Sequence, residues 1–328
     1  MTTIRIASRG SKLALWQAEY VKSLLMEHGF LAKIHIIKTK GDKVQNRFLH
    51  EIGGKGLFVR ELEQSMLDGE TDLGIHSLKD LPANLPEPFD LPAILQRHSS
   101  RDVLIFRKEV FERLSLKKEK LITPEDLANM GALTIGTASL RRQSMIKSIE
   151  TKITLKPLRG NVDTRLAKLH SGQFDAIILA EAALDRLELT DELYYPLDPS
   201  WFVPSPAQGA LAIECLKSHP LRDALSKMNC MDTMQAVTTE RLVLAKLGGD
   251  CTMPIGCHLS VLDNKVISRV KVLNYDGINC TDEWSHNENI RNIDPDQVSD
   301  GILSRMKANN LTPILEDLKK EPPNLGEL

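Results

Sequence analysis

The chain contains 328 residues, enough for two domains of about 150 residues each, or three if one is small. The 42 Lys and Arg residues against 44 Asp and Glu give a net charge of −2, and aromatic residues make up only 5%. Proteins that bind nucleic acid usually carry a basic excess, and single-strand binders add stacking aromatics, so this composition argues against nucleic acid as the main partner.

The sequence also argues against a membrane or secreted protein. No apolar run reaches the roughly 18 residues that a transmembrane helix needs, and the N-terminus lacks the apolar core of a signal peptide. The five cysteines are an odd number without a C-x-x-C pair, which is typical of reduced thiols and not of a disulfide framework or zinc site. We therefore expect a cytoplasmic protein without a bound metal.

In the first half of the chain, hydrophobic periodicity predicts alternating strands and helices. The expected elements are a strand (3–7), a helix (13–28), a strand (34–36), a helix (58–67) and a strand (71–77) that ends in a turn (76–82). Residues 40–56 are polar and glycine-rich, and a loop of that length usually has a function.

The second half repeats this plan. Its expected elements are a helix that begins at Thr123-Pro124, a strand (133–138), a helix after Ser139, a strand (153–158), a helix (162–170) and a strand (174–180). The stretches GETDLGIHS and GQFDAIILA place Asp72 and Asp175 at matching positions. Alternating strands and helices predict a mostly parallel α/β sheet in each half, with ligands at the carboxyl ends of the strands and a cleft between the halves.

The C-terminal third follows a different pattern, typical of a small α+β unit. A strand (210–215) is followed by a helix (232–247), two strands (258–263 and 265–274) joined by an Asp263-Asn264 hairpin, a third strand (279–285) and a helix (296–308). The charged segment 107–122 gives no clear pattern.

Basic residues recur where strands end or helices begin. These are Arg9, Arg141, Arg142 and Arg159, with Lys55, Lys79, Arg165 and Arg186 as further candidates nearby. Exposed backbone N–H groups at such positions favour anions, and guanidinium groups pair with carboxylate or phosphate. Any one of these cations could be a solvated surface charge, but their recurrence predicts a polyanionic ligand.

Two other side chains are candidates for chemistry. Asp80 follows a strand that ends at the same edge, where a carboxylate can stabilise a developing positive charge, take up a proton, or simply cap the next turn. Cys251 lies in the glycine-rich loop GGDCTMPIG, where a thiol could be an attachment point, a nucleophile or a small buried side chain. His76 fits a structural, hydrogen-bonded histidine, and no partners complete a metal site around Cys251 and Cys257.

Eight motifs in chain order resemble those of the porphobilinogen deaminase (hydroxymethylbilane synthase) family. They are ASRGSKLALWQA (7–18), IGGKGLFVRELE (52–63), DLGIHSLKDLP (72–82), IGTASLRRQ (135–143), LRGNVDTRL (158–166), FDAIILAEAAL (174–184), AQGALAIEC (207–215) and GGDCTMPIG (248–256). The resemblance implies two periplasmic-binding-protein-like α/β domains flanking a cleft, plus a small C-terminal α+β domain. The implied boundaries are 1–100 with 204–220, 101–203, and 221–328, so that the strand 210–215 completes the sheet of the first domain.

The resemblance also implies a reaction. Cys251 would carry a dipyrromethane cofactor through a thioether, and four porphobilinogen molecules would be added in sequence, each with loss of ammonia. The linear tetrapyrrole hydroxymethylbilane would then be released by hydrolysis. Each pyrrole ring carries an acetate and a propionate, which explains a cation-lined cleft in a nearly neutral protein. Asp80 matches the family's catalytic aspartate, which would bond pyrrole N–H groups and stabilise cationic states.

Other roles are carried over by motif position. Cofactor binding is expected from Cys251, Lys79, Asp80, Ser139, Arg141 and Arg142. Substrate binding is expected from Arg9, Ser11, Lys55, Ser77, Arg159, Arg165, Arg186 and Gln208. Residues 43–58 would form a lid, and the family suggests a monomer.

The chain departs from the family pattern in three places: Asp250 replaces the second glycine before the cysteine, Glu51 stands where members often have lysine, and the stretch 107–122 is longer than usual. From the residues alone, two other functions are conceivable. A non-catalytic anion-binding protein would give no role to Cys251. A transferase for a phosphorylated substrate would usually need a glycine-rich phosphate loop, which the sequence lacks.

Intact-protein mass spectrometry tests the attachment site directly. We expect an added mass of two linked pyrrole units that maps to the peptide containing Cys251 and is lost in Cys251→Ser. A bare thiol that gains this mass on incubation with porphobilinogen would be the apoenzyme. A mass that never changes would rule out the deaminase and leave the anion-binding alternative.

Overall fold

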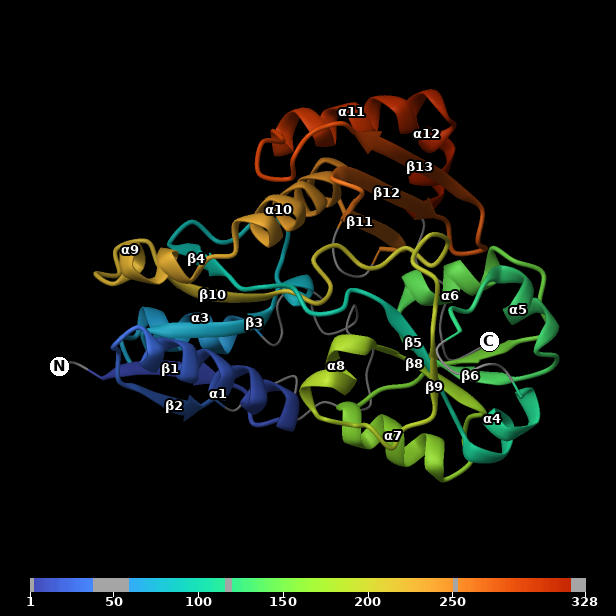
Figure 1. Ribbon diagram of the computed structural model, residues 1–328, viewed down its shortest axis with the longest axis horizontal. Helices are drawn as coiled ribbons and strands as arrows, with labels where there is room; N and C mark the ends of the chain where they lie inside the picture. The colour runs from blue at the N-terminus through green and yellow to red at the C-terminus, as the bar shows by residue number, and fades with distance from the viewer. Residues whose placement is uncertain (1–2, 38–58, 116–119, 250–252, 320–328) are drawn as a thin grey trace. The chain divides into compact units, whose positions relative to one another are not determined.

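The computed structural model of the chain describes residues 3–37, 59–115, 120–249 and 253–319 (Figure 1). The predicted lid at 43–58, Lys55, Asp250 and Cys251 therefore lie outside the described residues. The chain forms two compact units, and each is described by itself. Unit 1 comprises Met1–His98, Arg186–Glu188 and Gly209–Met234, and unit 2 comprises Ser99–Asp185, Leu189–Gln208 and Gln235–Leu328. No helix in the described ranges is long and apolar enough to cross a membrane.

Unit 1 is built on a five-stranded sheet. In spatial order its strands are β2 (Ala32–Ile36), β1 (Ile4–Ser8), β3 (Leu73–Ser77), β10 (Leu211–Leu216) and β4 (Phe89–Ile94). The helical elements of this unit are α1 (Lys12–Glu27), α3 (Arg60–Leu67), η1 (Leu78–Asp80), α9 (Arg222–Leu225) and η2 (Ser226–Met228). Helix α1 buries Ala18, Val21 and Leu25 in the same core as Ile6 and Ile213, as its 3–4-residue apolar spacing predicts.

Unit 2 contains a second five-stranded sheet with the same plan. Its strands are β7 (Thr154–Lys156), β6 (Thr134–Gly136), β8 (Ala176–Ala180), β5 (Asp102–Phe106) and β9 (Tyr194–Pro196). In both sheets the first three strands are parallel, and the fourth, β10 or β5, runs antiparallel to both of its neighbours. The surrounding helices are α4 (Lys108–Leu114), α5 (Pro124–Asn129), α6 (Leu140–Lys147), α7 (Val162–His170) and α8 (Glu181–Arg186), whose last residue belongs to unit 1.

The two sheets share a local bonding pattern that the sequence repeat marks. The backbone N–H of Asp72 donates to Arg5 O (2.8 Å), and the Asp72 carboxylate accepts the Arg5 N–H (2.7 Å). In unit 2, Asp175 makes the same pair of bonds with Thr134, at 2.9 and 2.8 Å. Each aspartate thus fixes the start of one parallel strand against the next. The predicted internal repeat is therefore a repeat of structure.

A small antiparallel sheet follows in unit 2. Its strands are β11 (Ile255–Leu262), β12 (Lys265–Leu273) and β13 (Asn279–His286), and its helices are α10 (Met231–Lys246), which begins in unit 1, α11 (Pro295–Ala308) and α12 (Leu311–Leu318). Asp263 and Asn264 both have positive φ (49° and 61°), the backbone that a two-residue hairpin turn requires. The predicted hairpin and α+β character are confirmed.

The α/β fold class is confirmed, and β10 completes the first sheet as predicted. The periodicity did not identify β4, β5, β9 or α12, and 107–122 contains helix α4. Strand β5 has five buried residues in a row, and such a run has no alternation to reveal it. The three-domain boundaries and the cleft stay predictions.

The ion pair of Asp72 with Arg5 predicts a pH-dependent stability. Burial alone would raise the pKa of Asp72, but hydrogen bonds from the Arg5 side chain and backbone lower the pKa below its usual value. Because the folded-state pKa lies below the unfolded value of about 3.9, this stabilisation is complete above the unfolded value. It is lost as the pH falls through the folded pKa.

We expect Asp72→Asn to lower the free energy of unfolding by about 1–2 kcal/mol at pH 7, because the pair is partly exposed. The difference from wild type should shrink toward zero below about pH 4. Urea unfolding across this range measures it, with the exposed Asp223→Asn as control. If the difference in unfolding free energy between wild type and Asp72→Asn stays constant down to the lowest pH, the ion pair of Asp72 with Arg5 is not its source.

Candidate functional site

Asp80 lies at the carboxyl end of β3 in unit 1, on a turn that is fastened to the sheet. Leu78 is fully buried, and its N–H donates to Ala210 O (3.0 Å). The Ser77 hydroxyl accepts a hydrogen bond from Gln17 of α1 (2.9 Å). Asp80 itself is exposed. A solvent-accessible carboxylate on an anchored turn can meet a ligand without first breaking the fold.

Arg9 and Ser11 lie in the connection between β1 and α1 in unit 1. Ser11 is the N-cap of α1, and its hydroxyl accepts the Ala14 N–H (3.3 Å). Arg9 is half-buried directly after β1. Both residues therefore occupy the strand-to-helix turn that the sequence predicts for anion binding.

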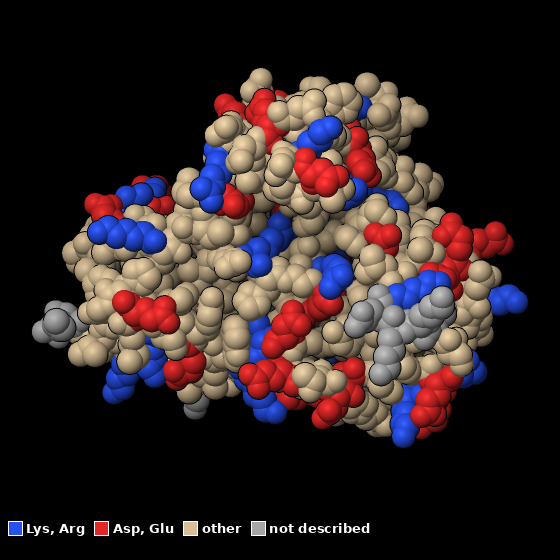
Figure 2. All heavy atoms as spheres, viewed as in Figure 1, with Lys and Arg blue, Asp and Glu red and all other residues tan. Residues whose placement is uncertain are grey.

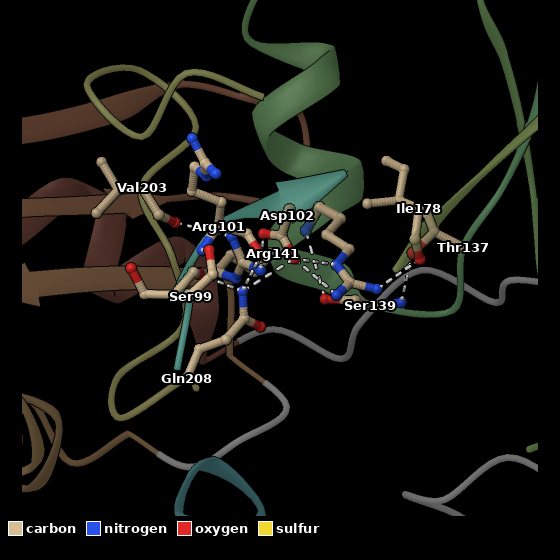
Figure 3. A network of polar contacts seen from close by, with 11 residues as sticks. Ser99, Arg101, Asp102, Thr137, Ser139, Arg141, Ile178, Val203 and Gln208 are labelled. Atoms are coloured by element: carbon tan, nitrogen blue, oxygen red, sulfur yellow. Dashed lines mark hydrogen bonds and ion pairs between the residues drawn. The ribbon is translucent and has the colours of Figure 1, made fainter. Parts of the chain in front are cut away.

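In unit 2, Arg141 and Arg142 lie on the first turn of α6 and share one buried carboxylate, that of Asp102 (Figure 3). Arg141 Nη2 is 2.6 Å from Asp102 Oδ2, and Arg142 bonds Asp102 Oδ1 through Nε (3.1 Å) and Nη2 (2.7 Å). The same guanidinium groups donate to the carbonyl oxygens of Val203 and Ile178, each at 2.7 Å. Every side chain of this ion triad is at least nine-tenths buried.

The triad carries two positive charges against one negative charge. Burial lowers the pKa of Arg141 from its usual value, and Arg142 adds to this effect, whereas Asp102 opposes it. A guanidinium stays protonated even so, because its reference pKa exceeds 12. The first turn of α6 therefore holds one excess buried positive charge, which an incoming carboxylate would neutralise.

Ser139 and Gln208 complete the surroundings of the triad. Ser139 is the N-cap of α6, and its hydroxyl accepts the Arg142 N–H (3.4 Å). The Gln208 side-chain amide donates to Ser100 O (2.6 Å) and to Asp102 Oδ1 (3.1 Å). Gln208 is almost fully buried, and its role in substrate binding stays a prediction.

The other predicted cations occupy different places. Arg159 and Arg165 flank the start of α7 in unit 2, where Arg165 Nε donates to Gly160 O (2.8 Å) and both side chains are half-buried. Arg186 is buried in unit 1 and donates to Gly209 O (2.7 Å). Lys79 lies beside Asp80 in η1 and is partly exposed.

The structure therefore gathers the predicted residues into local groups. In unit 1, Ser77, Lys79 and Asp80 lie at the end of β3, and Arg9 and Ser11 lie at the end of β1, the strand that pairs with β3. Unit 2 brings together Ser139, Arg141, Arg142 and Gln208 around Asp102.

The sequence reasoning missed several buried acids, among them Asp102 and Glu214. Asp102 begins an apolar strand, and an acid next to a fully buried run was the only available signal. Glu214 lies on β10, with Oε2 at 2.8 Å from His76 Nε2, and both side chains are buried, which fits the structural reading of His76. Burial, followed by the charge of Glu214, raises the pKa of the neighbouring Glu63. Among the described residues, no cluster of three or more His, Cys, Asp or Glu side chains could hold a metal ion.

The fold and these groups define an α/β protein that presents arginines and an exposed carboxylate at the ends of its strands. A family model described as "Porphobilinogen deaminase, dipyromethane cofactor binding domain" matches residues 4–222. The protein named porphobilinogen deaminase in Sulfurimonas denitrificans is 41% identical over 281 residues, covering 83% of this chain and 84% of that protein. Its namesake in a Nitratiruptor species is 43% identical over 268 residues, covering 80% and 81%.

The chain therefore belongs to the porphobilinogen deaminase family of transferases, which act in tetrapyrrole biosynthesis with a dipyrromethane cofactor. The predicted family, enzyme class and cofactor are confirmed, and the two rival functions are set aside. Among solved structures, an ancestral cationic amino acid solute binding protein aligns with 75% of this chain and 91% of its own, at 13% identity and a TM-score of 0.41. No functional statement follows from a likeness of that size.

The shared carboxylate of the triad predicts a large cost for its removal. Asp102→Asn would leave two buried guanidinium groups without a countercharge, so we expect a loss of about 3–5 kcal/mol in the free energy of unfolding. Urea unfolding measures the loss, with the exposed Asp300→Asn as the matched control. A change no larger than that of the control would show that Asp102 is not the countercharge.

Proposed function

We propose that this chain condenses four porphobilinogen molecules, with loss of ammonia at each addition, on a dipyrromethane cofactor bound through a thioether to Cys251. Hydrolysis then releases hydroxymethylbilane. Family membership supports the reaction. The observation that carries the proposal in the structure is the arginine pair on the first turn of α6, with one carboxylate for two guanidinium groups.

The donor set around α6 fits the cofactor. Each of its two pyrrole rings carries an acetate and a propionate, so it needs several hydrogen-bond donors and excess positive charge. Arg141 and Arg142 supply that charge, and Ser139 adds a hydroxyl at the helix start. We assign these three residues, with Lys79 and Asp80, to cofactor binding.

When bound, the cofactor supplies the nucleophilic pyrrole carbon on which the product grows. We assign to Asp80 the stabilisation of positive charge on the substrate as ammonia leaves, and the uptake of the proton that the new ring loses. Its exposure supports this role, because an exposed carboxylate is free to accept hydrogen bonds from pyrrole N–H groups.

Carboxylate recognition on the substrate is assigned to the remaining predicted residues. They are Arg9, Ser11, Lys55, Ser77, Arg159 and Arg165, with Arg186 and Gln208 acting through the backbone that they bond. We further assign residues 43–58 as a lid.

We propose that the protein works as a cytoplasmic monomer without nucleic-acid or membrane partners. The near-neutral charge supports the absence of a nucleic-acid partner, and basic and acidic side chains are interspersed over the face drawn in Figure 2. Light scattering after size exclusion measures the mass in solution, and a mass of two chains would contradict the monomer.

Asp80→Asn is the most direct test of the catalytic assignment. Because Asp80 is exposed, we expect an unchanged melting temperature, and because the charge is lost, we expect turnover to fall by about 10²–10³-fold. Porphobilinogen consumption, followed with an acidic aldehyde pyrrole reagent, measures the rate.

The matched control is Asp68→Asn, which removes another exposed carboxylate of unit 1 and should leave turnover unchanged. Near-normal turnover of Asp80→Asn would remove Asp80 from the mechanism. Failure of the wild type to consume porphobilinogen would overturn the proposed reaction itself.

A further inference from the structure

Glu240 on α10 is a fully buried carboxylate that bonds two separate stretches of backbone in unit 2. It accepts the N–H of Ala207 at 2.6 Å and the N–H of Leu259 at 2.8 Å. Ala207 belongs to the 203–208 segment, and Leu259 belongs to β11. One side chain therefore ties these two segments together, and both hydrogen bonds help to offset the cost of burying the acid.

The Ala207 bond holds a strained turn. Ala207 has a φ of 60°, a left-handed conformation that a residue with a Cβ adopts only when its surroundings enforce it. The turn closes through the Gln208 N–H, which donates to Ser205 O (3.0 Å). This conformation aims the Gln208 amide at Asp102, as Figure 3 shows. The charge of Glu240 therefore stabilises the turn that presents Gln208 to the ion triad.

The second hydrogen bond of Glu240, from the Leu259 N–H, involves strand β11, which follows the predicted cofactor cysteine Cys251 in the sequence. Strand β11 packs closely on the 203–208 segment. The Cys257 N–H donates to Pro204 O (2.9 Å), and a Cβ on Gly256 would lie 2.5 Å from Val203 O, so only glycine fits there. Val203 O is also the acceptor of Arg141 Nη1. Strand β11, which follows residue 251 in the sequence, is thus joined to the 203–208 segment, which also bonds Arg141.

We infer that Glu240 is a positioning residue for the reaction: it fixes the 203–208 segment against β11, so that Gln208 and Val203 hold Asp102 and the arginine pair in the orientation that ligand binding requires. This inference rests on the proposed function. A purely structural role would lower the melting temperature only. A positioning role also slows turnover of folded, cofactor-loaded enzyme, because the arginine pair loses its orientation.

Glu240→Gln is the primary variant, because the amide keeps the shape but turns one acceptor into a donor that faces a backbone N–H. In folded enzyme that carries the full cofactor mass, we expect kcat to fall about tenfold or more with little change in KM. The matched control, Glu283→Gln, removes an exposed carboxylate of β13 in the same unit and should leave both parameters unchanged. Glu240→Asp, which keeps the charge, should restore part of the rate.

Combining Glu240→Gln with Gln208→Ala tests the connection to the ion triad. If Glu240 acts through Gln208, the double variant should be no more than about twofold slower than the slower single variant. Full additivity of the two losses would overturn the connection, and wild-type kcat and KM in loaded Glu240→Gln would overturn the inference.

Hydrogen exchange of the wild type keeps the inference testable if the variants do not fold. The amides of Ala207 and Leu259 should exchange slowly and with the same protection, since one carboxylate holds both. Exchange of the Ala207 amide at the rate of an unstructured peptide would overturn the inference. A wild type that consumes no porphobilinogen would count against the proposed function, and the exchange rates would still decide the position of Glu240.

Discussion

The arrangement of unit 2 depends on the burial of three charges at one point, Asp102 with Arg141 and Arg142. Charges in a low-dielectric interior are tolerated only when they are paired and hydrogen-bonded, and here backbone carbonyls satisfy the guanidinium groups as well. Strand β5, the start of α6 and the segment before β10 must therefore all be in place together. The excess positive charge of this arrangement can attract an anionic ligand.

The repeated sheets explain how one chain builds two similar units. Each sheet has an antiparallel strand next to its three parallel ones, β10 in unit 1 and β5 in unit 2. Both antiparallel strands begin within a few residues of a point where the chain passes from one unit to the other. These passages are also where Gln208 bonds Ser100 O and where the His98 N–H donates to Gly209 O (3.1 Å).

Asp102 and Asp80 have different surroundings, and we assign them different roles for that reason. Asp102 is buried and paired with two cations, so its charge is committed to holding α6. Asp80 is exposed on a turn whose neighbour Leu78 is buried, so its position is fixed while its carboxylate is available. Burial and pairing with two cations distinguish the structural acid from the one assigned to catalysis.

The family, the alternation of strands and helices and the internal repeat were predictable from the amino-acid sequence, because periodicity, turn residues and motif spacing are local properties. The same local patterns supplied the candidate cations. It did not identify β4, β5 or β9; β5 is fully buried and β9 has only three residues, so neither strand leaves an alternation to recognise. It also missed that Gln208 and Arg186 bond backbone, and that Asp102 and Glu240 are buried. Those partners lie tens of residues away along the chain, and only tertiary packing brings a donor and an acceptor together out of water.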